Sequence, residues 1–258
     1  MKFNIILSGV GGQGILTMAY FLDHAAAAKG YHFKQAEVHG MSQRGGSVYS
    51  HLRISDREIL SDLIPEGSAD MILSVEPLEV QRYLHLLKPD GYVISNDQPF
   101  INIRDYPATN EVVGALLKLP NTIVFNAKKT AVSAKSPKAQ NTAILGAALP
   151  FLPFEIDDFA PSVERLFSRK GDKVVRANMR VFRIASRIGE FYKKLLNRGV
   201  SSAIIYRLLL KISIPTVDPQ ITTEIAEIIL KNSNPETCVD QINGKIACTV
   251  ENIRKVFN

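Results

Sequence analysis

Two glycine-rich stretches near the amino terminus contain the residues best suited to bind a phosphorylated ligand. The first, Gly9-Val10-Gly11-Gly12-Gln13-Gly14, has the spacing G-x-G-x-x-G between an apolar run and an alanine-rich run of helical period. Glycines let the backbone approach a phosphate, and the following helix supplies N–H groups and a partial positive charge. The alternative is a tight strand-to-helix turn in which the glycines serve packing alone. Phosphate or nucleotide binding is the preferred interpretation, with these candidate residues: Gly9, Gly11, Gly12, Gln13 and Gly14.

The second stretch reads His39-Gly40-Met41-Ser42-Gln43-Arg44-Gly45-Gly46-Ser47. It follows Glu37, which lies about where a dinucleotide site places an acidic residue for the ribose hydroxyls. Ordinary dehydrogenases lack such a second loop. Its guanidinium, hydroxyl and N–H groups suit a phosphorylated ligand better than a bare nicotinamide, and the alternative is a surface turn with an incidental arginine. The loop adds four candidate binding residues: Arg44, Gly45, Gly46 and Ser47.

Other residues that could do chemistry are few. His39 could act as an acid or base, but no nucleophile accompanies it, so packing or hydrogen bonding to the loop is preferred. The segment Glu76-Pro77-Leu78-Glu79 is interpreted as a helix start with acidic residues in its first turn. Cys238 and Cys248 form no Cys-x-x-Cys, which excludes an intrinsic iron–sulfur cluster or zinc ribbon on ligand count. We therefore assign no catalytic residue and no metal ligand to the chain.

Short apolar runs that alternate with helical patterns position these loops. Strands are predicted at 3–8, 31–38, 51–54, 70–75, 92–95 and 121–125, and helices at 15–29, 77–87 and 141–149. Continuous apolar strands joined by helices indicate a sheet covered on both faces. The fold class is therefore α/β, a Rossmann-like, doubly wound and mostly parallel sheet. Later segments have only helical patterns, which predicts a domain at 1–190 and a helical C-terminal extension at 191–258.

Charge is spread unevenly over the 258 residues. The net charge is +6, but residues 165–211 contain thirteen lysines and arginines against Asp172 and Glu190 alone, a local balance of +11. The rest of the chain therefore sums to −5. Four arginines of this segment recur at helical spacing: Arg176, Arg180, Arg183 and Arg187. A solvated face and an acidic partner surface both explain them, whereas the absence of interleaved aromatic residues argues against a nucleic-acid partner.

Several collinear stretches resemble the gamma-type domain of the pyruvate, ketoisovalerate and indolepyruvate ferredoxin oxidoreductases. The longest, Glu37 to Val48, has the sequence EVHGMSQRGGSV and is particularly similar to the small beta subunits of the indolepyruvate type. The resemblance covers about residues 1 to 190, and residues from about 200 onward match nothing in the family. The other matching stretches are 11–14, 50–53, 69–70, 76–79, 87–91, Asn141 and 145–146.

The resemblance implies that the chain is the small subunit of a thiamine-dependent keto-acid:ferredoxin oxidoreductase acting on indolepyruvate or another aryl pyruvate. Such enzymes decarboxylate the keto acid on thiamine diphosphate, pass electrons through iron–sulfur clusters to ferredoxin, and transfer the acyl group to coenzyme A. The resemblance places the thiamine diphosphate and the clusters in a large alpha subunit. It gives this chain a share of the coenzyme A site, at Gly11–Gly14 and Arg44–Ser47, where two N–H-rich loops and an arginine would receive its phosphates.

Two other hypotheses remain on the residues alone. One is a self-sufficient enzyme that uses NAD or S-adenosylmethionine at the glycine turn, and the other is a scaffold that has lost its ligand. The apolar runs are too short for a signal peptide or a membrane helix. We therefore expect a cytoplasmic protein without a membrane partner. The resemblance implies that the chain is active as an oxidoreductase only in a hetero-oligomer.

Overall fold

The computed structural model describes residues 1–39, 45–212, 219–232, 238 and 242. Short 3-10 helices at Leu84–Leu86, Leu149–Phe151 and Ser168–Lys170 follow α2, α5 and α6 directly. The main elements are, in chain order, β1 (Lys2–Val10), α1 (Ile15–Ala28), β2 (His32–His39), β3 (Ser47–Ser55), β4 (Ala69–Ser74), α2 (Pro77–Tyr83), β5 (Leu87–Asn96), α3 (Thr109–Leu116), β6 (Thr122–Phe125), α4 (Ala127–Ser133), α5 (Gln140–Ala148), α6 (Ile156–Phe167), α7 (Asp172–Leu196), α8 (Ser202–Lys211) and α9 (Pro219–Lys231).

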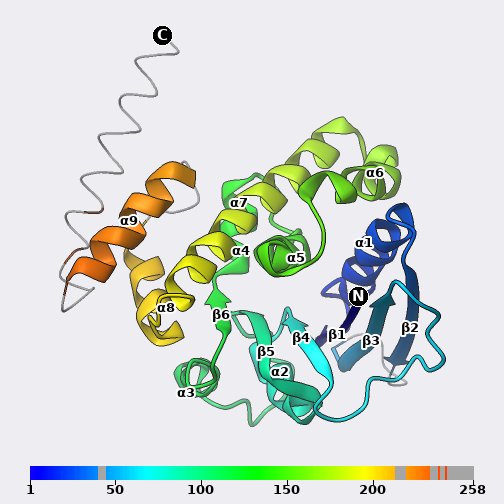
Figure 1. The fold of residues 1–258 in the computed structure, drawn as a ribbon, viewed down its shortest axis with the longest axis horizontal. Coiled ribbons are helices and arrows are strands. Elements are labelled where there is room, and N and C mark those ends of the chain that lie inside the picture. The colour runs from blue at the N-terminus through cyan, green and yellow to red at the C-terminus, as the bar shows by residue number, and fades with distance from the viewer. Residues whose placement is uncertain (40–44, 213–218, 233–237, 239–241, 243–258) are drawn as a thin grey trace.

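A six-stranded sheet in the order β2-β3-β1-β4-β5-β6 lies between two layers of helices (Figure 1). Strands β1, β4, β5 and β6 pair in parallel, whereas β3 pairs antiparallel with both of its neighbours, β1 and β2. The predicted α/β class with a mostly parallel sheet is therefore confirmed. Helix α1 connects β1 to β2, yet these two strands are not neighbours in the sheet, because β3 lies between them. The sequence did not indicate this strand order.

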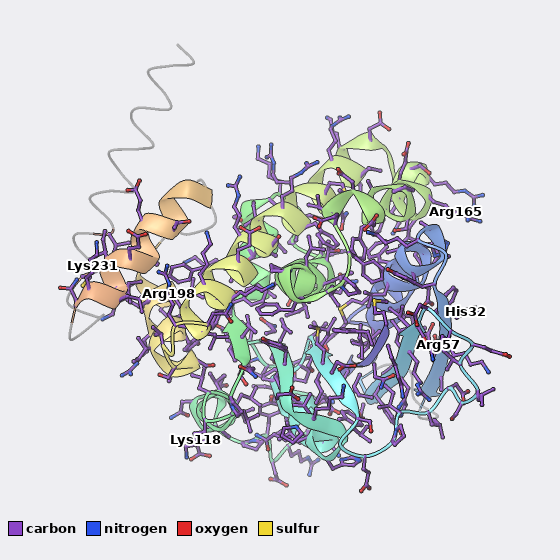
Figure 2. All side chains as sticks on the ribbon, viewed as in Figure 1. His32, Arg57, Lys118, Arg165, Arg198 and Lys231 are labelled. Carbon is purple, nitrogen blue, oxygen red and sulfur yellow. The ribbon has the colours of Figure 1, made fainter. Side chains whose placement is uncertain are left out.

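Both faces of the sheet are buried because successive side chains of a strand point to opposite sides. On β1, Ile5 and Leu7 join a core shared with α1, α5 and α7, while Ile6 joins a second core with α2 and α3. Side chains fill the space between the sheet and the helices on each side (Figure 2). This two-sided burial explains why the first strand is a continuous apolar run rather than an alternating one.

Helices α5 and α7 approach each other closely at two glycines. A Cβ added to Gly146 would lie 2.7 Å from the carbonyl oxygen of Phe182, and one added to Gly189 would lie 2.1 Å from that of Ala147. Any side chain at either position would force the helix backbones apart. Packing of these helices is therefore the physical reason for a glycine at the 145–146 stretch that resembles the family.

The last helices pack against the outer strand of the sheet. The Thr122 N–H of β6 donates to Ser202 Oγ at 3.3 Å, and the Tyr192 hydroxyl donates to the Val124 carbonyl at 2.7 Å. These contacts satisfy backbone groups that an open sheet edge would leave unpaired. Helix α7 runs unbroken across residue 190. The division into domains at that residue stays a prediction.

Some local predictions are wrong. The sequence Lys-Pro-Asp-Gly at 88–91 favours a turn, but the segment belongs to β5, and Pro161 lies inside α6 although proline usually ends a helix. The short helices α3 and α4 were not predicted. In each case tertiary packing prevails over local propensity.

No helix in the described part of the chain is long and apolar enough to cross a membrane.

Asp23 on α1 gives the fold a pH dependence. Its Oδ1 atom is buried without a hydrogen-bond partner among the described residues. Burial, with a smaller contribution from the charge of Glu37, raises the pKa of Asp23 from 3.8 to about 7. The folded protein is therefore most stable with respect to Asp23 below about pH 4, where this carboxyl is protonated in both the folded and the unfolded state. That contribution is lost as the pH rises through 7, because the folded state must then carry a buried charge.

We expect Asp23→Asn to raise the free energy of unfolding by about 3 kcal/mol at pH 8 and by less than about 1 kcal/mol at pH 4, since the neutral amide removes the cost of ionisation. Urea unfolding at the two pH values measures the difference. Asp90→Asn, at an exposed position, is the matched control. Equal effects of Asp23→Asn at both pH values would contradict this account.

Candidate phosphate-binding site

The first glycine loop lies at the carboxyl edge of the sheet, between β1 and α1, as predicted. Because β1, β4, β5 and β6 are parallel, the loops that follow them all emerge at this edge. In open α/β sheets this edge, outside the carboxyl ends of the strands, is where ligands bind. The geometry of the loop therefore decides what the edge can hold.

The loop presents backbone rather than side chains to the solvent. Gly12 and Gly14 have left-handed φ values of 96° and 81°, and a Cβ added to Gly12 would meet no atom within 4 Å. Gly14 is the N-cap of α1, and no side chain caps the first N–H groups of that helix. The loop, the first turn of α1 and Val48 line a hollow of about 290 Å³. Uncapped N–H groups beside an open hollow suit a phosphate.

Three residues fix the shape of this loop. Gln13 Oε1 accepts a hydrogen bond from the Val10 N–H at 2.8 Å, which closes the turn on itself. Gly9 lies within β1, where an added Cβ would be 2.7 Å from Ile15 Cδ1. Asn141 of α5 donates from Nδ2 to the Gly14 carbonyl at 3.1 Å. Sequence reasoning matched Asn141 to the family but missed its contact with the loop.

The structure brings the two glycine-rich stretches together. The Gly11 N–H donates to the Gly46 carbonyl at 2.8 Å, and the Gly45 N–H donates to the Gly11 carbonyl at 3.5 Å. These bonds continue the β1–β3 ladder, which ends at the pair Val10 and Ser47. Arg44 and the His39 side chain lie outside the described residues. Gly11 of the first stretch therefore lies directly against Gly45 and Gly46 of the second, whereas Gly9 is buried within β1.

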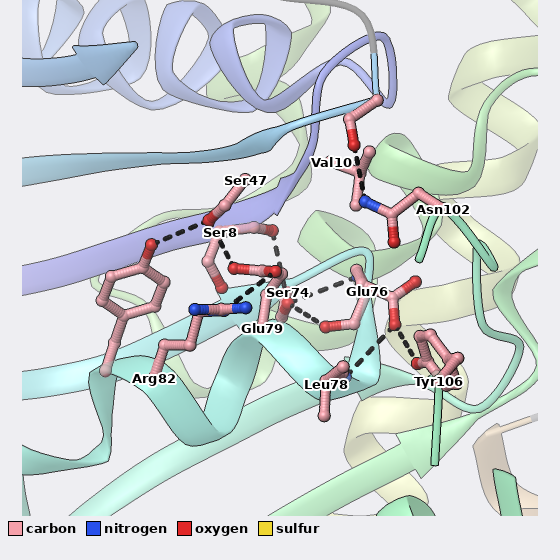
Figure 3. A network of polar contacts seen from close by, with 12 residues as sticks. Ser8, Val10, Ser47, Ser74, Glu76, Leu78, Glu79, Arg82, Asn102 and Tyr106 are labelled. Atoms are coloured by element: carbon pink, nitrogen blue, oxygen red, sulfur yellow. Dashed lines mark hydrogen bonds and ion pairs between the residues drawn. The ribbon is translucent and has the colours of Figure 1, made fainter. Parts of the chain in front are cut away.

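Ser47 points toward α2 rather than toward the glycines. Its hydroxyl donates to Glu79 Oε2 at 2.5 Å and lies 3.1 Å from the Tyr83 hydroxyl (Figure 3). Arg82 donates to the other oxygen of Glu79 at 3.2 Å. These contacts anchor the start of β3, and a direct role for Ser47 in ligand binding stays a prediction.

Glu76 links α2 to the loop that follows β5. The side chain is 1 % exposed and accepts from the N–H groups of Leu78 at 3.2 Å and Phe100 at 2.6 Å, and from the Tyr106 hydroxyl (Figure 3). Burial raises the pKa of Glu76, and these hydrogen bonds lower it in part. The predicted helix start at Glu76 is confirmed, and the contacts with Phe100 and Tyr106 were not foreseen.

The loop held by Glu76 reaches the second glycine stretch through Asn102. Asn102 Nδ2 donates to the Gly45 carbonyl at 2.5 Å (Figure 3). Its neighbours Ile101 and Ile103 are 70 % and 44 % exposed, so the loop also presents apolar surface beside the glycines. No motif marks Asn102 in the sequence, because its role depends on a contact with a residue 57 positions away.

The position of Glu37 disfavours the dinucleotide alternative. Glu37 lies on β2 opposite Ser50, and β3 separates β2 from β1. Since neighbouring strands are about 4.8 Å apart, Glu37 is displaced by about one strand spacing from the place where a ribose would meet it.

Within the described residues, no three His, Cys, Asp or Glu side chains gather to hold a metal. The uncapped N–H groups of α1 and the open hollow beside them have the chemistry that an anionic ligand requires.

Comparison with known proteins identifies the family. Residues 4–188 match the family model described as pyruvate ferredoxin/flavodoxin oxidoreductase. The chain belongs to this family. Residues beyond 188, which include the end of α7 and all of α8 and α9, fall outside the family match.

Two curated relatives in the family are similar over most of their own length. The chain is 37 % identical to indolepyruvate oxidoreductase subunit IorB of Pyrococcus horikoshii over 190 residues, which cover 70 % of this chain and 93 % of that protein. It is 35 % identical to the subunit of the same name from Archaeoglobus fulgidus over 193 residues, or 71 % and 94 % of the two chains. The resemblance seen in the sequence is therefore confirmed.

A solved structure shows the same fold. The chain superposes on 2-oxoglutarate:ferredoxin oxidoreductase from Magnetococcus marinus with a TM-score of 0.59 at 18 % identity. The match covers 73 % of this chain and 31 % of that one, so this chain corresponds to under a third of the larger protein. That structure contains bound 2-oxoglutarate, coenzyme A and succinyl-CoA.

Proposed function

We propose that the chain is the small subunit of a keto-acid:ferredoxin oxidoreductase that converts indolepyruvate or a related aryl pyruvate into an acyl-CoA, and that it contributes part of the coenzyme A site. The observation that carries the coenzyme A proposal is the junction of the two glycine-rich stretches through Gly11 and Gly46, beside the uncapped start of α1. The names of the IorB relatives support the choice of keto acid.

The residues present fit coenzyme A. Its pyrophosphate would lie against the N–H groups at Gly12 and the first turn of α1, where a Cβ-free backbone leaves open space. Arg44 is the candidate for its ribose phosphate. The exposed Ile101 and Ile103 offer apolar contact to the pantetheine arm. Coenzyme A supplies the thiol that takes up the acyl group, and this chain holds and orients it.

The same proposal assigns the remaining cofactors to a partner. Thiamine diphosphate and iron–sulfur clusters would belong to a large alpha subunit, and ferredoxin would take electrons from the complex. The chain would then act in the cytoplasm as part of a hetero-oligomer and have no oxidoreductase activity alone. The NAD- or S-adenosylmethionine-dependent alternative is not favoured, because the family match and the displaced Glu37 both count against it.

Anaerobic purification of the tagged chain from its native cells tests the proposed function. We expect a large brown companion that contains iron, sulfide and thiamine diphosphate, with keto-acid-dependent dye reduction that requires both chains. Product analysis with indolepyruvate, phenylpyruvate and pyruvate then ranks the substrates. A colourless chain that emerges alone in repeated trials would contradict the proposal.

A further inference from the structure

One face of α7 carries a concentration of positive charge that the glycine site does not use. We call the residues Arg176, Arg180, Arg183 and Arg187 the arginine face. They follow one another at intervals of four, three and four, which places them on one side of the helix. They line a surface hollow of about 540 Å³ together with Val175, Met179 and Ile184. Side chains extend from α7 away from the sheet in Figure 2.

The opposite side of α7 accounts for the stability of the helix. Phe182, Ala185 and Tyr192 are fully buried in the core shared with α5, α6 and β6. The arginine face contributes nothing to that core. Like charges three and four positions apart destabilise a helix, so the spacing of the arginines opposes folding of the chain on its own. The repulsion between these arginines therefore has to be offset by negative charge outside this face of the helix.

Three of these arginines, Arg176, Arg180 and Arg183, have little countercharge in the described part of the chain. Arg176 lies 3.9 Å from Asp172, but the two side chains are 71 % and 86 % exposed, so solvent screens the pair. Arg180 and Arg183 are exposed and form no ion pair with a described residue. On α6, which packs against α7, the carboxylate of Asp158 is bound to Lys29 at 3.0 Å. The positive charge of Arg180 and Arg183 is thus directed toward the solvent.

We propose that the arginine face is the docking surface for an acidic patch on the large partner subunit. The inference rests on the proposed function, which requires a large subunit. Guanidinium groups bind carboxylates through two parallel hydrogen bonds and are less strongly hydrated than ammonium groups, so arginine is the cation that protein interfaces favour. Val175 and Ile184, which are half-buried and line the same hollow, add apolar surface beside the arginines.

The chemistry of the hollow favours a protein over a nucleic acid. No aromatic side chain is among the described residues that line it, and single-stranded nucleic acid is held by stacking on aromatic rings. Residues 165–211 have a net charge of +11, whereas the residues outside this segment sum to −5, so the positive field is confined to the segment that contains α7. A confined positive patch suits steering and orientation of one acidic protein surface.

The double variant Arg180→Glu with Arg183→Glu tests the docking surface in the assembled enzyme. We expect the dissociation constant of the complex to rise more than about tenfold at 100 mM salt, because attraction becomes repulsion at two positions. The midpoint of thermal unfolding of the variant chain alone should stay the same or rise. Glutamates at 180 and 183 lie four positions from Arg176 and Arg187, so attractive pairs replace repulsive ones. Co-expression with the large subunit, followed by size-exclusion chromatography and binding kinetics at 50 to 500 mM salt, measures both.

A matched control reverses two positive charges elsewhere. Lys118 and Arg57 lie away from α7 (Figure 2), so Lys118→Glu with Arg57→Glu should leave assembly unchanged. Assembly of the Arg180→Glu/Arg183→Glu variant with wild-type affinity would overturn the inference while the proposed function stands. Failure of the wild-type chain to assemble with any large subunit would overturn both. A third outcome would reassign the face to nucleic acid. In that case the wild-type chain binds single-stranded DNA in a salt-sensitive way, and the Arg180→Glu/Arg183→Glu variant loses this binding but still assembles with the large subunit.

Discussion

Gly12→Asp is expected to weaken coenzyme A binding by the assembled enzyme about a hundredfold. The left-handed backbone of Gly12 aims an added side chain into open space at the hollow beside α1. A carboxylate there would lie roughly 5 Å from a bound phosphate, and at an effective dielectric constant of about 20 that repulsion is about 3 kcal/mol for each unit of charge. Isothermal titration of the complex with coenzyme A measures the loss.

Two controls separate charge from backbone strain. Gly12→Ala introduces the same left-handed strain without a charge, so we expect a far smaller loss of affinity. Gly30→Asp places a carboxylate at the other end of α1, where φ is 73° and an added Cβ also meets nothing within 4 Å. This variant should bind coenzyme A normally. Unchanged affinity in Gly12→Asp would remove the glycine loop from the coenzyme A site.

Glu76→Ala is expected to lower the free energy of unfolding by about 3 kcal/mol and to free the loop at 97–106. The substitution removes the acceptor of three partly buried donors, the N–H groups of Leu78 and Phe100 and the Tyr106 hydroxyl, and the loss of each hydrogen bond costs about 1 kcal/mol. With the loop released, Asn102 loses its fixed position against Gly45. Urea unfolding and hydrogen exchange of the Phe100 amide measure the two effects.

The buried carboxylate of Glu79 provides the comparison for Glu76. Glu79 accepts hydrogen bonds from Ser47 and Arg82, and no hydrogen bond joins it to a described residue of the loop after β5. Glu79→Ala should therefore also destabilise the protein but leave the Phe100 amide protected under conditions where the fold is intact. Equal loss of protection in both variants would show that the loop responds to global stability rather than to Glu76.

The sequence specified the local features of the site well because they depend on neighbouring residues. The glycine spacing at 9–14 required a turn between a strand and a helix, and the structure has β1 and α1 on either side of it. The apolar runs required a sheet buried on both faces, and the two cores confirm it. Several collinear stretches, the longest from Glu37 to Val48, indicated the family, which the match over residues 4–188 then established.

Only the tertiary structure decided which of these parts meet. The insertion of β3 between β2 and β1 joins Gly11 to Gly46 and moves Glu37 away from the glycine loop. Asn102 and Asn141 reach the loops across 57 and 127 positions of sequence, which no periodicity or spacing encodes. The physical reason is that hydrogen bonds between distant segments depend on strand order and helix packing, and those follow from burial of the whole chain rather than from any one segment.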